Sequence, residues 1–183
     1  MHCPPVFSRV FTGLALAACG QERSEPPPAP RPIEVRDALG EVTARVAPGH
    51  PCRATVDGIE MIVGGRPLIA QYGSARWTGE DAENGTTFKT DGRAVARIHA
   101  RQLFDGEGIP ILRVLPDGGI ANAANQIVRT ASATPTGVTV GDLTVTGTDD
   151  VVLAAMLSAR EASPEVRALA ACHFLLPHAQ EAP

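Results

Sequence analysis

Aromatic side chains are scarce in this chain of 183 residues: they make up 4% of it, and Tyr72 and Trp77 are its single tyrosine and tryptophan. Sugar-binding surfaces usually depend on aromatic platforms, so this scarcity argues against a carbohydrate-binding module. An excess of basic residues is also absent, because the formal net charge is −4. A chain with this charge is poorly suited to neutralise phosphates, which argues against binding to nucleic acid and against electrostatic adhesion to anionic lipid head groups.

Recognisable catalytic motifs and long apolar runs are absent as well. The sequence contains no Gly-x-Ser-x-Gly nucleophile elbow, no His-Glu-x-x-His zinc motif and no phosphate-binding loop. The apolar run at residues 10–18 is long enough for the central part of a signal peptide but too short to span a bilayer. No motif therefore fixes a chemistry, and we expect no cofactor.

The apolar run ends in Leu16, Ala17 and Ala18, immediately before Cys19. This pattern resembles the lipobox of bacterial lipoproteins, and the resemblance covers about the first twenty residues. It implies that residues 1–18 are a signal peptide. It also implies that Cys19 carries lipid chains, among them palmitate, which anchor the protein in a membrane. Gly20 after the cysteine implies the outer membrane of a bacterial envelope, on its periplasmic side. An ordinary secretory signal followed by an unrelated cysteine is the alternative.

Residues 19–32 are predicted to be a tether, because five of the seven residues 26–32 are proline. Such a segment has little to bury and prefers the extended polyproline II conformation, at about 3.1 Å per residue. We expect it to hold a domain roughly 30–40 Å from the membrane. A ligand for a proline-binding module is the alternative.

From residue 33 onward, short apolar segments alternate with glycine-containing turns, which is typical of antiparallel hairpins. After residue 148 the apolar period becomes helical: Thr148 is the expected N-cap of a first helix, and Ser163 before Pro164 is the expected start of a second. The predicted class of residues 33–183 is α+β: a sandwich or partly open barrel of hairpins, with two C-terminal helices on one face or end of the sheet. The predicted strands are residues 33–36, 41–46, 53–56, 59–63, 67–72, 86–90, 93–99, 109–115, 120–128, 138–140 and 143–146.

A faint internal repeat aligns residues 37–46 with residues 105–114 without gaps. Each copy opens with an aspartate in a turn and ends in a strand of the form apolar-Arg-apolar. Arg45, Arg113 and the corresponding Arg97 are therefore predicted to point away from the core. We interpret them as solvated strand positions; a basic stripe for an anionic ligand is the alternative.

Cys52 and Cys172 form an even pair in a chain with an export signal, which favours one disulfide. The bond would close a loop of about 120 residues. In the loop-entropy model, closing such a loop stabilises the folded chain by roughly 4–5 kcal/mol. The alternative is a zinc site in which His50 and His173 join the two thiolates. Adjacent residues on a helix point about 100° apart, which makes joint ligation by Cys172 and His173 awkward. Unpaired thiols are a third possibility.

Two weaker clusters complete the candidates. Glu80, Asp81, Glu83 and Asn84 offer oxygen ligands for calcium, but their spacing does not match a calcium-binding loop, and a hairpin turn explains them. His99 is eight residues after Asp91 and six before Asp105, and it is the weak candidate for a catalytic histidine.

We therefore expect a membrane-anchored envelope lipoprotein whose β-rich domain binds an envelope protein or cell-wall partner, or has a structural role, without catalysis. The alternative is a lipoprotein hydrolase with a site around His99. A pocket containing His99 and a carboxylate would favour the hydrolase. An exposed apolar patch would favour the binding protein.

Overall fold

The computed structural model describes residues 30–65 and 67–176. Within them, fourteen strands precede two helices, which confirms the predicted α+β class with its antiparallel hairpins and C-terminal helices. The strands are β1 (Ile33–Arg36), β2 (Val42–Ala47), β3 (Cys52–Val56), β4 (Ile59–Gly64), β5 (Leu68–Tyr72), β6 (Ala75–Ala82), β7 (Gly85–Thr90), β8 (Arg93–His99), β9 (Gln102–Asp105), β10 (Pro110–Val114), β11 (Gly119–Ala121), β12 (Ile127–Thr134), β13 (Gly137–Val140) and β14 (Leu143–Thr146). The helices are α1 (Val151–Leu157) and α2 (Pro164–Leu175).

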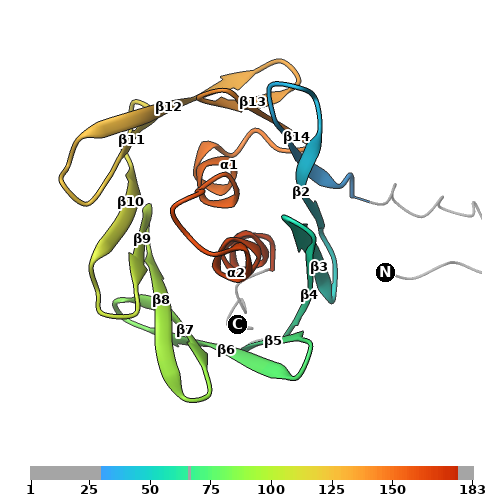
Figure 1. Cartoon of the computed structure of the whole chain (residues 1–183), viewed down its shortest axis with the longest axis vertical. Helices are drawn as coiled ribbons and strands as arrows, with labels where there is room; N and C mark the ends of the chain where they lie inside the picture. Colours follow the sequence, from blue (N-terminus) through green and yellow to red (C-terminus); the bar gives the residue numbers. More distant parts are fainter. Residues whose placement is uncertain (1–29, 66, 177–183) are drawn as a thin grey trace, which may run out of the picture.

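The strands form one closed barrel in which each strand pairs with its neighbours in sequence (Figure 1). All pairs are antiparallel, and β1 pairs with β14 to close the ring. Of the two expected architectures, the barrel is therefore the one observed, and it is closed. Closure leaves no unpaired strand edge, which removes the main route to edge-to-edge aggregation of a sheet.

Both helices lie inside the barrel rather than over one face or end of a sheet (Figure 1). Helix α2 packs mainly against β3 and β4, α1 packs against β12 and β13, and the two helices contact each other. Fourteen strands enclose a wider space than inward-facing side chains alone can fill. The helices occupy that space and complete the core.

The two helices are buried on nearly all sides. Residues 153–157 of α1 and residues 166–173 of α2 are all buried. A helix that is enclosed all round needs no polar stripe, and α2 uses Ala168, Ala170 and Ala171 to fit within the wall. The wall also contributes small inward residues, such as Ala54 and Ala96.

The strands alternate between the core and the outer surface, as β3 shows with buried Cys52, Ala54 and Val56 and exposed Arg53 and Thr55. Arg45, Arg97 and Arg113 each sit between two buried neighbours and point outward, as predicted. Each finds a local partner on the outer surface. Arg45 pairs with Glu34, Arg97 stacks on Phe104, and Arg113 donates to Asn125.

One strand prediction was wrong, and two strands, β6 and β9, were not predicted. The predicted strand at residues 120–128 is two strands, β11 and β12, separated by a turn in which the Asn122 side chain accepts from the backbone of Gln126. β6 was not predicted, because its sequence contains Gly79 and an acidic end. Gly79 is needed there, because a Cβ atom at that position would lie 2.8 Å from the Cβ of Leu68 on β5.

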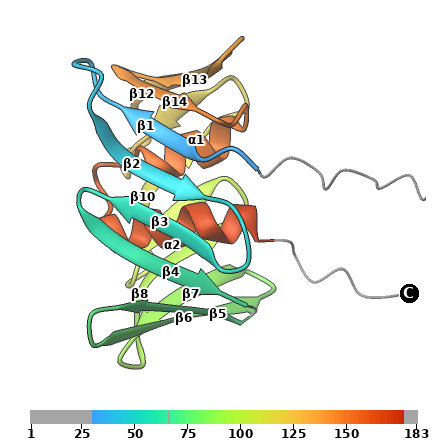
Figure 2. The same ribbon diagram turned by 90° about the vertical axis from the view of Figure 1, so that its right-hand side faces the viewer.

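The strand β1 begins and the helix α2 ends at the same end of the barrel, which we call the proximal end (Figure 2). The opposite, distal end carries turns such as Asp57–Gly58 and the connection between α1 and α2. A proline-rich segment that leads into β1 therefore joins the domain at its proximal end.

Candidate functional site

Cys19, the predicted lipid attachment site, lies outside the described residues, as do the signal peptide and most of the tether. His99 is exposed at the end of β8. Within the described part of the chain, no hydrogen bond or ion pair joins it to a carboxylate, and it lines neither of the hollows described below. The hydrolase alternative therefore gains no geometric support around His99.

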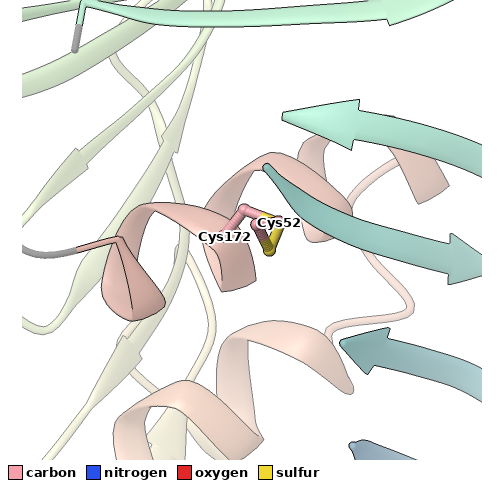
Figure 3. Close-up of a disulfide and its surroundings, with 2 residues drawn as sticks. All are labelled: Cys52 and Cys172. Carbon is pink, nitrogen blue, oxygen red and sulfur yellow. A yellow bond between two sulfur atoms is a disulfide. The ribbon is translucent and has the colours of Figure 1, made fainter. Parts of the chain in front are cut away.

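Cys52 and Cys172 lie at disulfide distance, with their Cα atoms 5.8 Å apart, consistent with the predicted bond (Figure 3). The bond joins β3 in the wall to α2 in the lumen, and both residues are fully buried. Sulfur atoms in a disulfide are not available as thiolate ligands for zinc. No cluster of three or more His, Cys, Asp or Glu placed to hold a metal ion occurs among residues 30–65 and 67–176.

The other members of the zinc alternative point elsewhere. His50 is exposed in the turn before β3. His173 is buried, and its ring meets the rings of Phe88 and Phe174 edge-on. Its Nδ1 atom lies 3.4 Å from the hydroxyl of Thr86.

A small polar cluster lies at the proximal end of the barrel, around a cavity of about 400 Å³. The buried Thr86 hydroxyl donates to Asp81 Oδ1 at 2.5 Å and also approaches His173. These contacts link the β6–β7 hairpin to the last turns of α2. Sequence reasoning placed Asp81 in an acidic loop and His173 in the alternative zinc site, and no sequence pattern singled out Thr86.

The remaining acidic residues near that hairpin have local roles. Glu80 forms an ion pair with Lys89 across β6 and β7, at 2.5 Å. Glu83 and Asn84 make the two-residue turn between these strands. A hairpin turn therefore accounts for this segment.

An apolar groove of about 740 Å³ runs along the outer face of β4 and β5. Ile62 and Ile69 form its walls and are 40% and 42% exposed, which is high for large aliphatic side chains in a strand. Pro51, Gly64 and Pro67 line its proximal part, and Gly73 lines its distal part. The groove combines apolar side chains with accessible backbone, so it can accept an apolar segment from outside.

Neither helix of the described residues has the length and apolar composition required to cross a membrane. The chain matches no protein-family model, no curated protein and no solved structure.

Proposed function

We propose that this chain is a lipid-anchored protein of the bacterial envelope, and that its barrel binds a protein partner without catalysing a reaction. The observation that carries the binding role is the apolar groove between Ile62 and Ile69. Large aliphatic side chains exposed together cost solvation free energy, and a partner that covers them recovers it at roughly 25 cal/mol per Å². The anchoring role rests on Leu16, Ala17, Ala18 and Cys19.

The position of the groove supports a partner at the membrane. Gly64 and Pro67 belong to the proximal end, where the tether joins the barrel. A tether of the predicted length holds this end nearer to the lipid than the distal end. The partner is therefore a protein of the same membrane or its periplasmic surface, with an apolar segment that lies along β4 and β5.

The filled lumen supports a role for the outer wall rather than for an internal binding cavity. Barrels of this width that bind ligands or conduct solutes do so inside. Here α1 and α2 occupy the interior, so contact with a large partner takes place on the outside.

A photo-crosslinking experiment tests the binding role. A crosslinking amino acid at Gln71, whose side chain lines the groove, is expected to capture one membrane-associated protein in intact cells. Ile69→Glu in the same chain should abolish that product, because a carboxylate in the groove cannot be desolvated cheaply. Ile127→Glu is the matched control, since Ile127 is 59% exposed on β12, outside the groove. Equal capture by both variants would contradict the proposal.

A further inference from the structure

Two arginines flank the apolar groove, one on each side. Arg53 on β3 pairs in register with Ile62 on β4. On the other side, Arg76 on β6 pairs with Gln71 on β5. Ile62 and Gln71 also pair with each other, so one row of side chains crosses the four strands, with an exposed arginine at each end. Adjacent strands lie about 4.8 Å apart, which places the Cα atoms of the two arginines about 14 Å apart with the groove between them.

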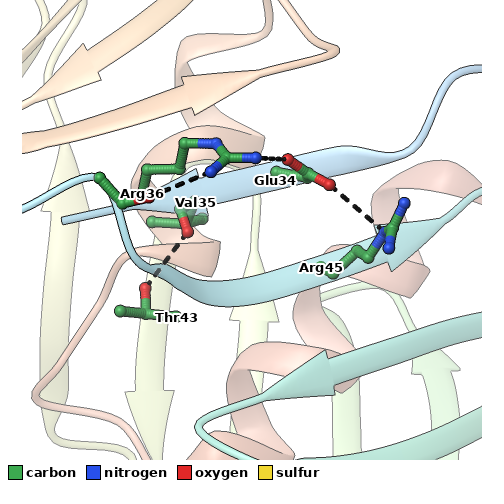
Figure 4. Close-up of polar contacts among 6 residues, drawn as sticks. Glu34, Val35, Arg36, Thr43 and Arg45 are labelled. Carbon is green, nitrogen blue, oxygen red and sulfur yellow. Dashed lines mark hydrogen bonds and ion pairs between the residues drawn. The ribbon is translucent and has the colours of Figure 1, made fainter.

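Neither arginine is neutralised within the described part of the chain. Two other arginines of the outer wall share an acidic partner, because Arg36 and Arg45 both pair with Glu34, as Figure 4 shows. No ion pair or hydrogen bond joins the side chain of Arg53 or Arg76 to another residue in the ranges 30–65 and 67–176. The groove is therefore an apolar strip between two solvated positive charges.

The carboxylates on the same strands do not cancel these charges. Glu60 on β4 lies in the next row toward the distal end. Glu80 on β6 is already paired with Lys89. Asp81, also on β6, accepts from the hydroxyl of Thr86. A partner that brings a carboxylate to each arginine therefore improves the charge balance on both sides of the groove, and such complementarity selects the partner and its orientation.

The backbone beneath the groove favours a helix over an extended segment. β4 and β5 are interior strands of the closed barrel, and each is paired on both sides. An extended segment laid on this face would therefore find no free strand edge with which to pair its own N–H and C=O groups. A helix satisfies these groups internally and, with its side chains, is about 10–12 Å across. It fits between the two arginines with one flank toward each.

Two other occupants match these observations less well. A two-fold contact between copies of the chain would pair this surface with itself and bring arginine against arginine. The helices α1 and α2 of a second copy are also enclosed in its own barrel (Figure 1). A fatty acid has apolar surface but only one carboxylate, which cannot reach arginines on opposite sides of the groove.

We propose that the partner contacts this groove through an amphipathic helix with acidic flanks. Its apolar face covers Ile62 and Ile69. A carboxylate on one flank pairs with Arg53, and a carboxylate on the other flank pairs with Arg76. The apolar contact supplies most of the affinity, and the two charge pairs fix the orientation of the helix. This inference rests on the proposed binding role of the groove and adds the chemistry of the partner.

Two synthetic peptides of about 18 residues, long enough to form a helix, test the proposal. Both carry one stripe of leucine; the first has glutamate on both flanks of the stripe and the second has lysine. Fluorescence anisotropy of the labelled peptides measures their affinity for the full chain in phosphatidylcholine nanodiscs. The glutamate peptide should bind about 10-fold more tightly, because the lysine peptide replaces two favourable surface pairs by two like-charge contacts. Ile69→Glu should abolish binding of the glutamate peptide.

Charge reversal on the protein supplies a second measurement. Arg53→Glu combined with Arg76→Glu should reverse the preference, so that the lysine peptide binds more tightly than the glutamate peptide. Arg93→Glu combined with Arg160→Glu is the matched control, since both arginines are exposed outside the groove and the net charge changes equally. This control should keep the preference for the glutamate peptide.

Equal affinities of the two peptides, an unchanged preference after charge reversal, or tighter binding of dodecanoate than of the glutamate peptide would overturn the proposal. Photo-crosslinking at Gln71 in cells separates this proposal from the binding role itself. A product that is lost with Ile69→Glu but kept after reversal of both arginines would mean that the groove binds a partner without acidic flanks. A product that is kept with Ile69→Glu would mean that the groove is not the binding surface.

Discussion

Asp37 and Asp105 occupy the same position in two separate turns at the distal end of the barrel and make the same contacts. Asp37 Oδ1 accepts from the backbone of Leu39 and Glu41, and Asp105 Oδ1 accepts from Glu107 and Ile109. The backbone bonds that close the two turns are also the same, and each turn places a glycine with positive φ at its fourth position. The repeat visible in the sequence is thus a repeated turn that sets the register of the following strand.

Asp37→Ala and Asp105→Ala should each lower the free energy of unfolding by about 1 kcal/mol, because each removes the acceptor for two backbone N–H groups. Asparagine in place of either aspartate keeps an oxygen acceptor and should recover most of the loss. Denaturant unfolding measures the effect, and Asp149→Ala, at an exposed position before α1, serves as control. If asparagine destabilises as much as alanine, the turn bonds are not the cause.

Replacing both Cys52 and Cys172 by alanine should lower the free energy of unfolding by about 2–5 kcal/mol. The bond holds α2 against the wall, so its loss should also increase hydrogen exchange in α2 more than in β6 and β7. Mass spectrometry without reductant should first show the bonded pair in the protein isolated from cells. His50→Ala should leave stability unchanged, since His50 is exposed; two free thiols with one equivalent of zinc would refute this interpretation.

Thr86→Val should cost about 1–2 kcal/mol of stability, because valine keeps the shape of threonine but gives up its bonds with Asp81 and His173. Thr55→Val, at an outward position on β3, is the matched control and should change stability by less than about 0.5 kcal/mol. Thermal unfolding of the two variants measures the difference. Equal effects would mean that the cluster does not hold α2.

Cys19→Ser should leave the chain uncleaved or outside the membrane fraction, because a hydroxyl does not accept the lipid by the same route. Cell fractionation, combined with labelling by a palmitate analogue, measures this outcome. Cys3→Ser is the control and should not affect labelling. An unaltered chain that takes up no label and stays in the soluble periplasm would disprove the lipoprotein interpretation.

Local pattern sufficed to predict most of the fold. Turn pairs such as Asp57–Gly58 and Asp91–Gly92 identified hairpins, and Ser163 before Pro164 identified the start of α2. β6 was not predicted because its Gly79 is required by the contact with Leu68 on the neighbouring strand β5. The sequence of a single segment does not reveal such a contact. The turn at Asn122 was not predicted, because its residues are also compatible with a continuous strand.

The positions of the helices, and the buried polar residues Arg167, Thr86 and His173, could not be predicted from local pattern because they depend on the closed barrel. A face of Val166, Leu169 and Leu176 predicts packing against one surface, whereas a lumen also buries the residues between them. For that reason Arg167, which helical periodicity assigns to the solvent, is buried beside Ser158. Thr86 and His173 meet for the same reason: their contact exists only when α2 runs through the ring.

The seam between β1 and β14 determines when this domain can fold. The first strand to leave the ribosome finds one of its two partners only after the last strand has been made, and α1 and α2 come later still. A nascent chain that stops before α2 has neither a complete core nor the thiol that Cys52 pairs with. Folding therefore waits for the whole polypeptide. A chain truncated within its last helix is accordingly a substrate for proteolysis rather than a smaller version of the domain.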